Sequence, residues 1–241
     1  MSRHIRILSI IFCFLSASVV AAPQLPPKRI QATYEVTKDG MPFANVHEQF
    51  VITGNSYKVE SVTKGIGIYA LFGERKLISV GELTNQGLKP AHFELQQGDN
   101  PKKALLADFD WSKSALHMLV KGTPKDAELA PGTQDLASYA YQFMFVPAPL
   151  KNEITVTLTT GKKLNQYVYK INAEQEVLNI AGMQYKTLHL LPPAPLDASK
   201  PPTETKELWL ATEHRYVPVR IMMIDENGQK LEQTLTELHV E

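Results

Sequence analysis

The sequence predicts a mainly β protein, a curved antiparallel sheet or open barrel-like meander of about 12 strands with one central amphipathic helix. Turn sequences recur along the chain, apolar and polar residues alternate in the runs between them, and one central segment departs from this alternation. The chain has 241 residues, of which 44% are hydrophobic. This length and composition suffice for one substantial core.

Turn sequences and alternation define the individual strands. Asp39-Gly40 is a hairpin turn sequence, because glycine accepts the positive φ that such turns require. It joins predicted strands over 30–38 and 42–53, and Gly54-Asn55 leads into a third over 57–64. Strict alternation of apolar and polar residues predicts further strands over 115–120, 154–159 and 217–223.

The central segment 133–146 carries the spacing of an amphipathic helix. Its apolar stripe consists of Leu136, Tyr139, Ala140, Phe143 and Met144. Thr133 can cap the N-terminal end, and Asp135 lies in the first turn, where the helix dipole favours a carboxylate. We therefore expect one helix that lies across the concave face of the sheet and covers an apolar cavity, because a wide open sheet cannot fill that face itself.

The first 21 residues predict a secretory signal peptide. Arg3 and Arg6 precede an apolar run, and small residues follow before Pro23. Cleavage is expected after Ala21, because Pro23 would hinder a cut after Ala22. The run of about 14 residues is shorter than the roughly 20 that span a bilayer. We expect a periplasmic protein with no transmembrane segment after cleavage, divided into signal peptide 1–21, flexible leader 22–29 and a single β-rich domain 30–241.

Composition argues against several classes of function. Cys13 is the only cysteine and lies in the signal peptide, so the mature chain would have no disulfide or thiolate chemistry. The 25 basic residues balance the 25 acidic ones, so we expect no nucleic-acid partner. Because the histidines are scattered, we also predict no metal site and no cofactor.

No motif identifies a catalytic centre, and we predict no catalytic residues. The alternative is a hydrolase or carbohydrate-active enzyme that uses Asp108, Asp110 and a distant histidine. These two carboxylates would face one side of a strand beside Trp111, whose ring could stack on a sugar. A solvated strand face that ends in a turn explains the same residues more simply.

The segment 65–73 is uncharged and bounded by glycines. It is either a buried strand or a turn packed on the core, or else a mobile apolar loop at the opening of a cavity, where it would meet a lipid or a partner. Together with the apolar stripe it supplies the candidate residues for binding a lipid or other hydrophobic ligand. These are Ile66, Ile68, Tyr69, Leu71, Phe72, Leu136, Tyr139, Phe143 and Met144.

A second function class is a partner-binding module of an envelope complex. Residues 192–202 contain five prolines and form either a stiff spacer or a docking site. Sheet edges offer another route to a protein partner.

Several short stretches occur in a fixed order over most of residues 30–240. They are Leu77-Ile78-Ser79-Val80-Gly81, Gly87-Leu88-Lys89-Pro90-Ala91-His92-Phe93, Ala107-Asp108-Phe109-Asp110, Gln134-Asp135-Leu136-Ala137-Ser138, Lys206-Glu207-Leu208-Trp209-Leu210 and Tyr216-Val217-Pro218-Val219-Arg220. In this order they resemble the domain of unknown function 3108 family of bacterial envelope proteins, although Ala137 departs from the more varied position expected there. The resemblance implies a secreted β-rich envelope protein with no assigned activity and no known catalytic residues.

Overall fold

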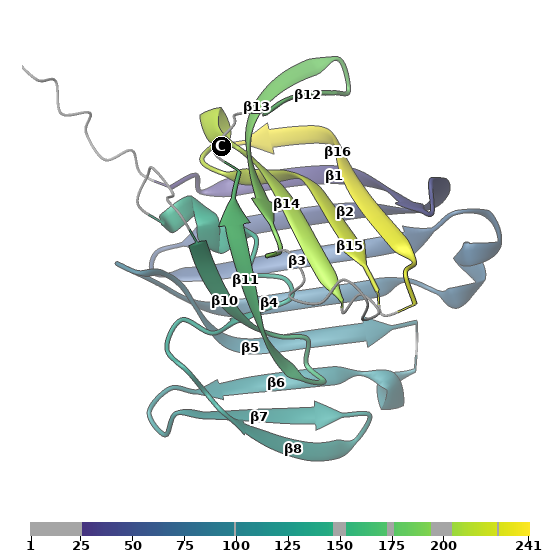
Figure 1. Cartoon of the computed structure of the whole chain (residues 1–241). Coiled ribbons are helices and arrows are strands. Elements are labelled where there is room, and N and C mark those ends of the chain that lie inside the picture. Colours follow the sequence, from purple (N-terminus) through teal and green to yellow (C-terminus); the bar gives the residue numbers. More distant parts are fainter. Residues whose placement is uncertain (1–25, 99, 147–152, 173–175, 194–203, 226) are drawn as a thin grey trace, which may run out of the picture.

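A computed structural model describes residues 26–98, 100–146, 153–172, 176–193, 204–225 and 227–241 (Figure 1). The predicted signal peptide, half of the leader and most of the proline-rich segment lie outside the described residues, so those predictions remain predictions. In the described parts, sixteen strands form one large open sheet that is antiparallel at every pairing except one. None of the helices in these parts is long and apolar enough to cross a membrane.

The first eight strands follow one another as successive hairpins. They are β1 (Arg29–Lys38), β2 (Met41–Thr53), β3 (Ser56–Gly65), β4 (Arg75–Thr84), β5 (Gly87–Gln97), β6 (Leu105–Asp110), β7 (Ala115–Val120) and β8 (Thr123–Glu128). The predicted turn at Asp39-Gly40 is confirmed, and both residues have positive φ, 50° and 81°. Two 3-10 helices, η1 (Gly67–Phe72) and η2 (Pro101–Lys103), lie in the β3–β4 and β5–β6 connections.

The remaining eight strands vary more in length, from two to eleven residues. They are β9 (Gln134–Asp135), β10 (Glu153–Thr159), β11 (Leu164–Ile171), β12 (Glu176–Ile180), β13 (Met183–Leu191), β14 (Thr205–Ala211), β15 (Val217–Ile224) and β16 (Lys230–Val240). The 3-10 helices η3 (Tyr141–Phe145) and η4 (Thr212–His214) complete the described structure. The predicted alternating strands over 115–120, 154–159 and 217–223 correspond to β7, β10 and β15.

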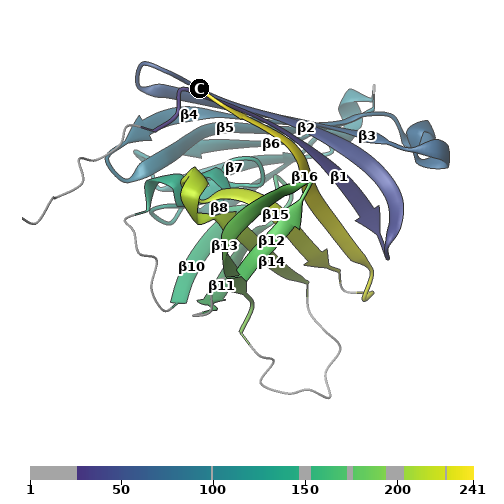
Figure 2. The same ribbon diagram turned by 90° about the horizontal axis from the view of Figure 1, so that it is seen from above.

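The two halves of the chain meet at the centre of the sheet, where β1 pairs with both β2 and β16. From β1 the sheet continues through β2 to the edge strand β8, and in the other direction through β16, β15, β14, β13, β11 and β10 to β9. The second half turns back across the first, so that β10, β11, β14 and β15 cross strands of the first half in Figure 1 and form a separate layer in Figure 2. The molecule is therefore one curved sheet folded into two facing layers.

The predicted central helix is wrong. Residues 133–146, which we call the inner segment, form the short strand β9, a series of turns and the five-residue helix η3. Its apolar residues divide between two cores: Ala137, Tyr141 and Met144 pack toward the first layer, and Tyr139, Ala140 and Phe143 pack toward the second. A segment that is buried on both sides carries apolar residues facing both layers. In the sequence of the inner segment, these residues happen to fall at the spacing of an amphipathic helix.

The predicted number of about 12 strands was too low. β8 is exposed along nearly its whole length, so it lacks the alternation that marks a strand with one buried face. β9 is only two residues long and is stabilised by parallel pairing with β10, a contact between distant parts of the sequence. Neither strand carries a periodic signal of its own.

Candidate functional site

A cavity of about 510 Å³ lies between the two layers. Its walls are mainly apolar and come from both halves of the chain. The apolar lining consists of Val36, Phe43, Val46, Leu77, Leu95, Leu105, Leu136, Ala137, Ala140, Ile221, Met223 and Leu231. The polar lining consists of Glu48, Ser61, Thr63, Arg75, Tyr139, Tyr141, Thr160, Lys162, Glu204, Lys206 and Gln233.

The inner segment closes one end of this cavity. Gln134 donates from Nε2 to the carbonyl of Leu88 at 2.8 Å, and the Leu88 amide donates to Gln142 Oε1 at 2.7 Å, which ties the segment to β5. Its strand β9 pairs with β10 of the second layer. The lining residues that the segment contributes at 137 and 139–141 are all buried. The inner segment, in place of the predicted helix, thus contributes to the wall of the cavity.

The cavity opens at the opposite end, where the lining side chains are partly or fully exposed. Phe43, Thr63 and Arg75 lie there, next to the β1–β2 turn and the β3–β4 connection. Lys162, from the β10–β11 turn of the second layer, is exposed at the same cavity. The exposed lining residues therefore come from both layers.

A carboxyl group is buried in the interior of the cavity. Tyr141 donates its hydroxyl to Glu48 Oε2 at 2.9 Å, and Ser61 donates to Oε1 at 3.1 Å. Burial raises the pKa of Glu48, and these hydrogen bonds only partly oppose the shift. Burial therefore works against the charged form of Glu48.

A buried lysine on the second layer is fully paired. Lys206, only 4% exposed, contacts Glu204 Oε1 and lies 3.2 Å from the hydroxyl of Tyr167. Lys163 Nζ also lies 3.3 Å from Glu204 Oε2. Burial alone would raise the pKa of Glu204, but the hydrogen bond and charge of Lys206 outweigh it and lower the pKa to about 2. The cluster joins two lysines through one carboxylate in the cavity wall, and the charge of Lys206 is paired.

The predicted binding residues fall into two groups. Leu136 and Tyr139 line the cavity, whereas Phe143 and Met144 are buried in the cores beside it. The second group lies in the β3–β4 connection: Ile66, Ile68, Leu71 and Phe72 are exposed, and Tyr69 is partly buried. The structure thus contradicts the buried-strand interpretation of this segment and shows an exposed 3-10 helix.

This exposed helix adjoins the open end of the cavity. The ring of Tyr69 packs on Phe43, with centroids 4.5 Å apart, and Phe43 is itself a lining residue. The exposed fractions of Ile68, Leu71 and Phe72 are 73%, 87% and 70%. We call these three side chains the apolar loop cluster.

Sequence reasoning missed most of the cavity wall. The usable signal was a charged residue at an inward-facing strand position. Glu48 alternates with the buried Val46 and Phe50, and Arg75 alternates with the buried Leu77. Burial of a charge costs free energy, so such a residue either has a partner or serves a site.

The paired carboxylates of the alternative enzyme lie on the outer face. Asp108 Oδ1 contacts His92 Nδ1 at 2.6 Å, and both side chains are exposed. Asp110 instead accepts a hydrogen bond from Ser112 at 2.6 Å and contacts Lys113 Nζ at 2.9 Å, within the β6–β7 turn. Each carboxylate has its own solvated partner. Neither carboxylate lines the cavity between the two layers or the smaller hollow on the outer face of the sheet.

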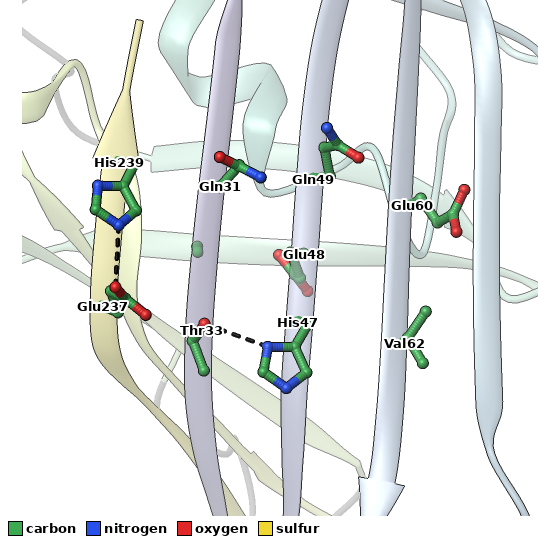
Figure 3. A pocket seen from close by; sticks show the side chains of 10 residues that line it. Gln31, Thr33, His47, Glu48, Gln49, Glu60, Val62, Glu237 and His239 are labelled. Carbon is green, nitrogen blue, oxygen red and sulfur yellow. Dashed lines mark hydrogen bonds and ion pairs between the residues drawn. The ribbon is translucent and has the colours of Figure 1, made fainter.

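A second, smaller hollow of about 310 Å³ lies on the outer face of β16, β1, β2 and β3 (Figure 3). Its side chains stand apart on neighbouring strands. His47 contacts Thr33 at 3.3 Å, and His239 contacts Glu237 at 3.0 Å. No group of three or more histidine, cysteine or acidic residues in the described ranges could hold a metal ion. This hollow is a solvated sheet face.

The fold and its cavity define a mainly β protein built on one curved, open antiparallel sheet. A family model described as a protein of unknown function (DUF3108) matches residues 31–236, and the chain belongs to this family. The resemblance seen in the ordered motifs is thereby confirmed. A comparison with curated proteins found no match.

Proposed function

We propose that this chain is a periplasmic, non-enzymatic binding protein that holds a lipid or other hydrophobic ligand in the cavity between its layers. The observation that carries the proposal is the cavity itself. Its volume of about 510 Å³ lies within the range of about 300–1,000 Å³ typical of small-molecule sites. Its walls are mainly apolar, as a hydrophobic ligand requires. The signal-peptide pattern at residues 1–21 supports the location.

The cavity can be blocked selectively. Thr63 lies at the open end, where a larger side chain has room, whereas Lys64 follows it on the opposite face of β3. We expect Thr63→Trp to lower the affinity for an apolar probe at least tenfold, because the indole occupies ligand volume. Lys64→Trp should leave it unchanged. Probe fluorescence titrations measure both affinities, and native mass spectrometry of protein from periplasm identifies any retained lipid.

Equal binding by the two variants would place the probe outside the cavity and contradict the proposal. A wild-type protein that carries no lipid and binds no apolar probe would contradict it as well. In that case the partner-binding alternative gains weight, since the apolar loop cluster is also a surface that a protein partner could cover. Crosslinking in intact cells would then identify the partner.

The apolar loop cluster gives a second prediction. We expect the triple substitution of Ile68, Leu71 and Phe72 by serine to leave folding stability within about 0.5 kcal/mol, because these side chains are exposed. Uptake of lipid from vesicles should slow severalfold, since the exposed side chains supply the apolar contact with the vesicle surface. Affinity for a probe added from solution should not change, because the cavity is intact.

One kinetic and one equilibrium measurement check this prediction. Stopped-flow transfer of a fluorescent lipid from vesicles reports uptake, and equilibrium titration reports affinity. Unchanged transfer would remove the cluster from lipid delivery. A parallel fall in affinity would mean that the cluster forms part of the binding site itself.

A further inference from the structure

One cation at the open end of the cavity has no anionic partner. Arg75 is the first residue of β4 and faces inward, on the same side of the strand as Leu77 and Ser79. Its guanidinium forms no ion pair or hydrogen bond with any residue in the described ranges. The neighbouring Lys76 faces outward and contacts Glu60 at 2.9 Å. The pairing of Lys76 and the isolation of Arg75 follow from the opposite faces on which they lie.

The acidic groups of the cavity are engaged elsewhere. Glu204 is shared by Lys206 and Lys163, and Glu48 accepts hydrogen bonds from Tyr141 and Ser61. Burial lowers the pKa of the Arg75 guanidinium, which shows that its charge is partly desolvated without a compensating anion. A guanidinium stays protonated even so, and a desolvated charge gains from an anion that binds to it.

A second free cation comes from the opposite layer. Lys162, in the turn between β10 and β11, lines the same cavity and forms no ion pair with the described residues. The cavity therefore has an unpaired cation on each layer, together with a mainly apolar lining. This distribution is complementary to a molecule with an anionic head and an apolar tail.

We propose that the ligand is an anionic amphiphile, an acyl chain ending in a carboxylate or a phosphate ester, and that Arg75 binds its head group at the open end of the cavity. The inference rests on the proposed binding function and names its ligand class. Carboxylate and phosphate both accept paired hydrogen bonds from a guanidinium. The acyl chain would extend inward toward Leu136 and the inner segment. Lys162 would add charge attraction from the second layer.

The test compares two probes that differ only in head-group charge. A conjugated-polyene fatty acid and its methyl ester both fluoresce in apolar sites, and they have the same chain. We expect the wild-type protein to prefer the acid about tenfold or more, because a charge-assisted bond forms only with the carboxylate. Arg75→Met should abolish this preference and leave ester affinity unchanged, since methionine retains apolar bulk. Arg75→Lys should restore part of it, and Lys76→Met is the matched outward-facing control.

Competition distinguishes the two sources of negative charge. If a lysophosphatidic acid displaces the probe more effectively than a free fatty acid does, the ligand carries a phosphate head group. If the free fatty acid is the better competitor, the ligand carries a carboxylate head group. Inorganic phosphate alone should not displace the probe, because the chain supplies much of the affinity. Displacement by phosphate alone would overturn the amphiphile assignment.

The apoprotein supplies a readout that a purely structural arginine would not give. Because Arg75 has no partner, Arg75→Met should keep or raise the melting temperature of the ligand-free protein. A lowered melting temperature with equal loss of both probes would show a structural role and overturn the inference. Equal wild-type affinity for acid and ester would also overturn it, while leaving the binding function intact. If neither probe binds the wild type, both proposals fail.

Discussion

Phe143→Ala is expected to lower the free energy of unfolding by about 3–5 kcal/mol, the usual loss when a buried phenylalanine is removed and a cavity remains. Phe143 lies in η3 of the inner segment and is 2% exposed. It packs in a core with Leu158, Leu208 and Leu210 of the second layer. The inner segment holds this core against the first layer, so the lost packing should also loosen the closed end of the cavity. Urea unfolding measures the stability, and probe titration measures the accompanying loss of affinity.

Phe72→Ala is the matched control. It removes the same side chain from the apolar loop cluster, where Phe72 is 70% exposed. Its effect on stability should stay within about 0.5 kcal/mol, as for most surface substitutions. If Phe143→Ala changed neither stability nor affinity, the inner segment would not be the element that closes the cavity.

The strands of the first layer could be predicted because their signals are local. Asp39-Gly40 determines the first hairpin, and alternation shows which side of each strand faces inward. The inner segment could not be predicted, because its conformation depends on contacts with both layers. Gln134 and Asp135 pair with β10, more than twenty residues away along the chain. Tertiary pairing therefore determined the conformation of a segment whose own spacing favours a helix.

Part of the candidate site could likewise be predicted from the sequence, and part could not. The composition of residues 66–72 identified an unusual apolar segment, and the structure adds its exposure and its position beside Phe43. The cavity wall could not be predicted from the sequence, because it forms only where the second half of the sheet crosses the first. Arg75 and Glu48 become informative once inward and outward faces are known, since the sequence alone does not show whether an inward charge has a partner.

A buried carboxyl group in the inner segment gives the chain a distinctive pH dependence. Asp135 is 0% exposed and accepts hydrogen bonds at Oδ1 from the amides of Ala137 and Ser138, each at 2.9 Å. Ser79 donates its hydroxyl to Oδ2 at 2.5 Å and also contacts the hydroxyl of Tyr57 at 3.1 Å. Burial outweighs these hydrogen bonds and raises the pKa of Asp135 from 3.8 to about 6. The folded protein therefore retains a proton at a pH where the unfolded chain has released it.

The sign of the effect follows from proton linkage. Between pH 3.8 and about 6 the folded state binds more protons at Asp135 than the unfolded state, so this group's contribution to stability falls as the pH rises. The loss is about 3 kcal/mol by pH 7. This loss of stability is absent below the pKa of Asp135 in the unfolded chain, because Asp135 is then protonated in both the folded and the unfolded state. Glu48, whose pKa is also raised by burial, adds a contribution of the same sign.

Asp135→Asn isolates this contribution. The asparagine Oδ1 can keep both backbone hydrogen bonds, and its amide nitrogen can donate to Ser79, so the variant removes the charge and retains the turn. Relative to wild type, Asp135→Asn should gain about 2.4 kcal/mol between pH 4 and pH 7, measured by urea unfolding at both values. Asp135→Ala should show the same relative gain but start from a lower stability at both pH values, because it leaves two buried amides without an acceptor. Parallel curves for wild type and Asp135→Asn would mean that Asp135 ionises as it does in the unfolded chain, and that the inner segment does not bury it.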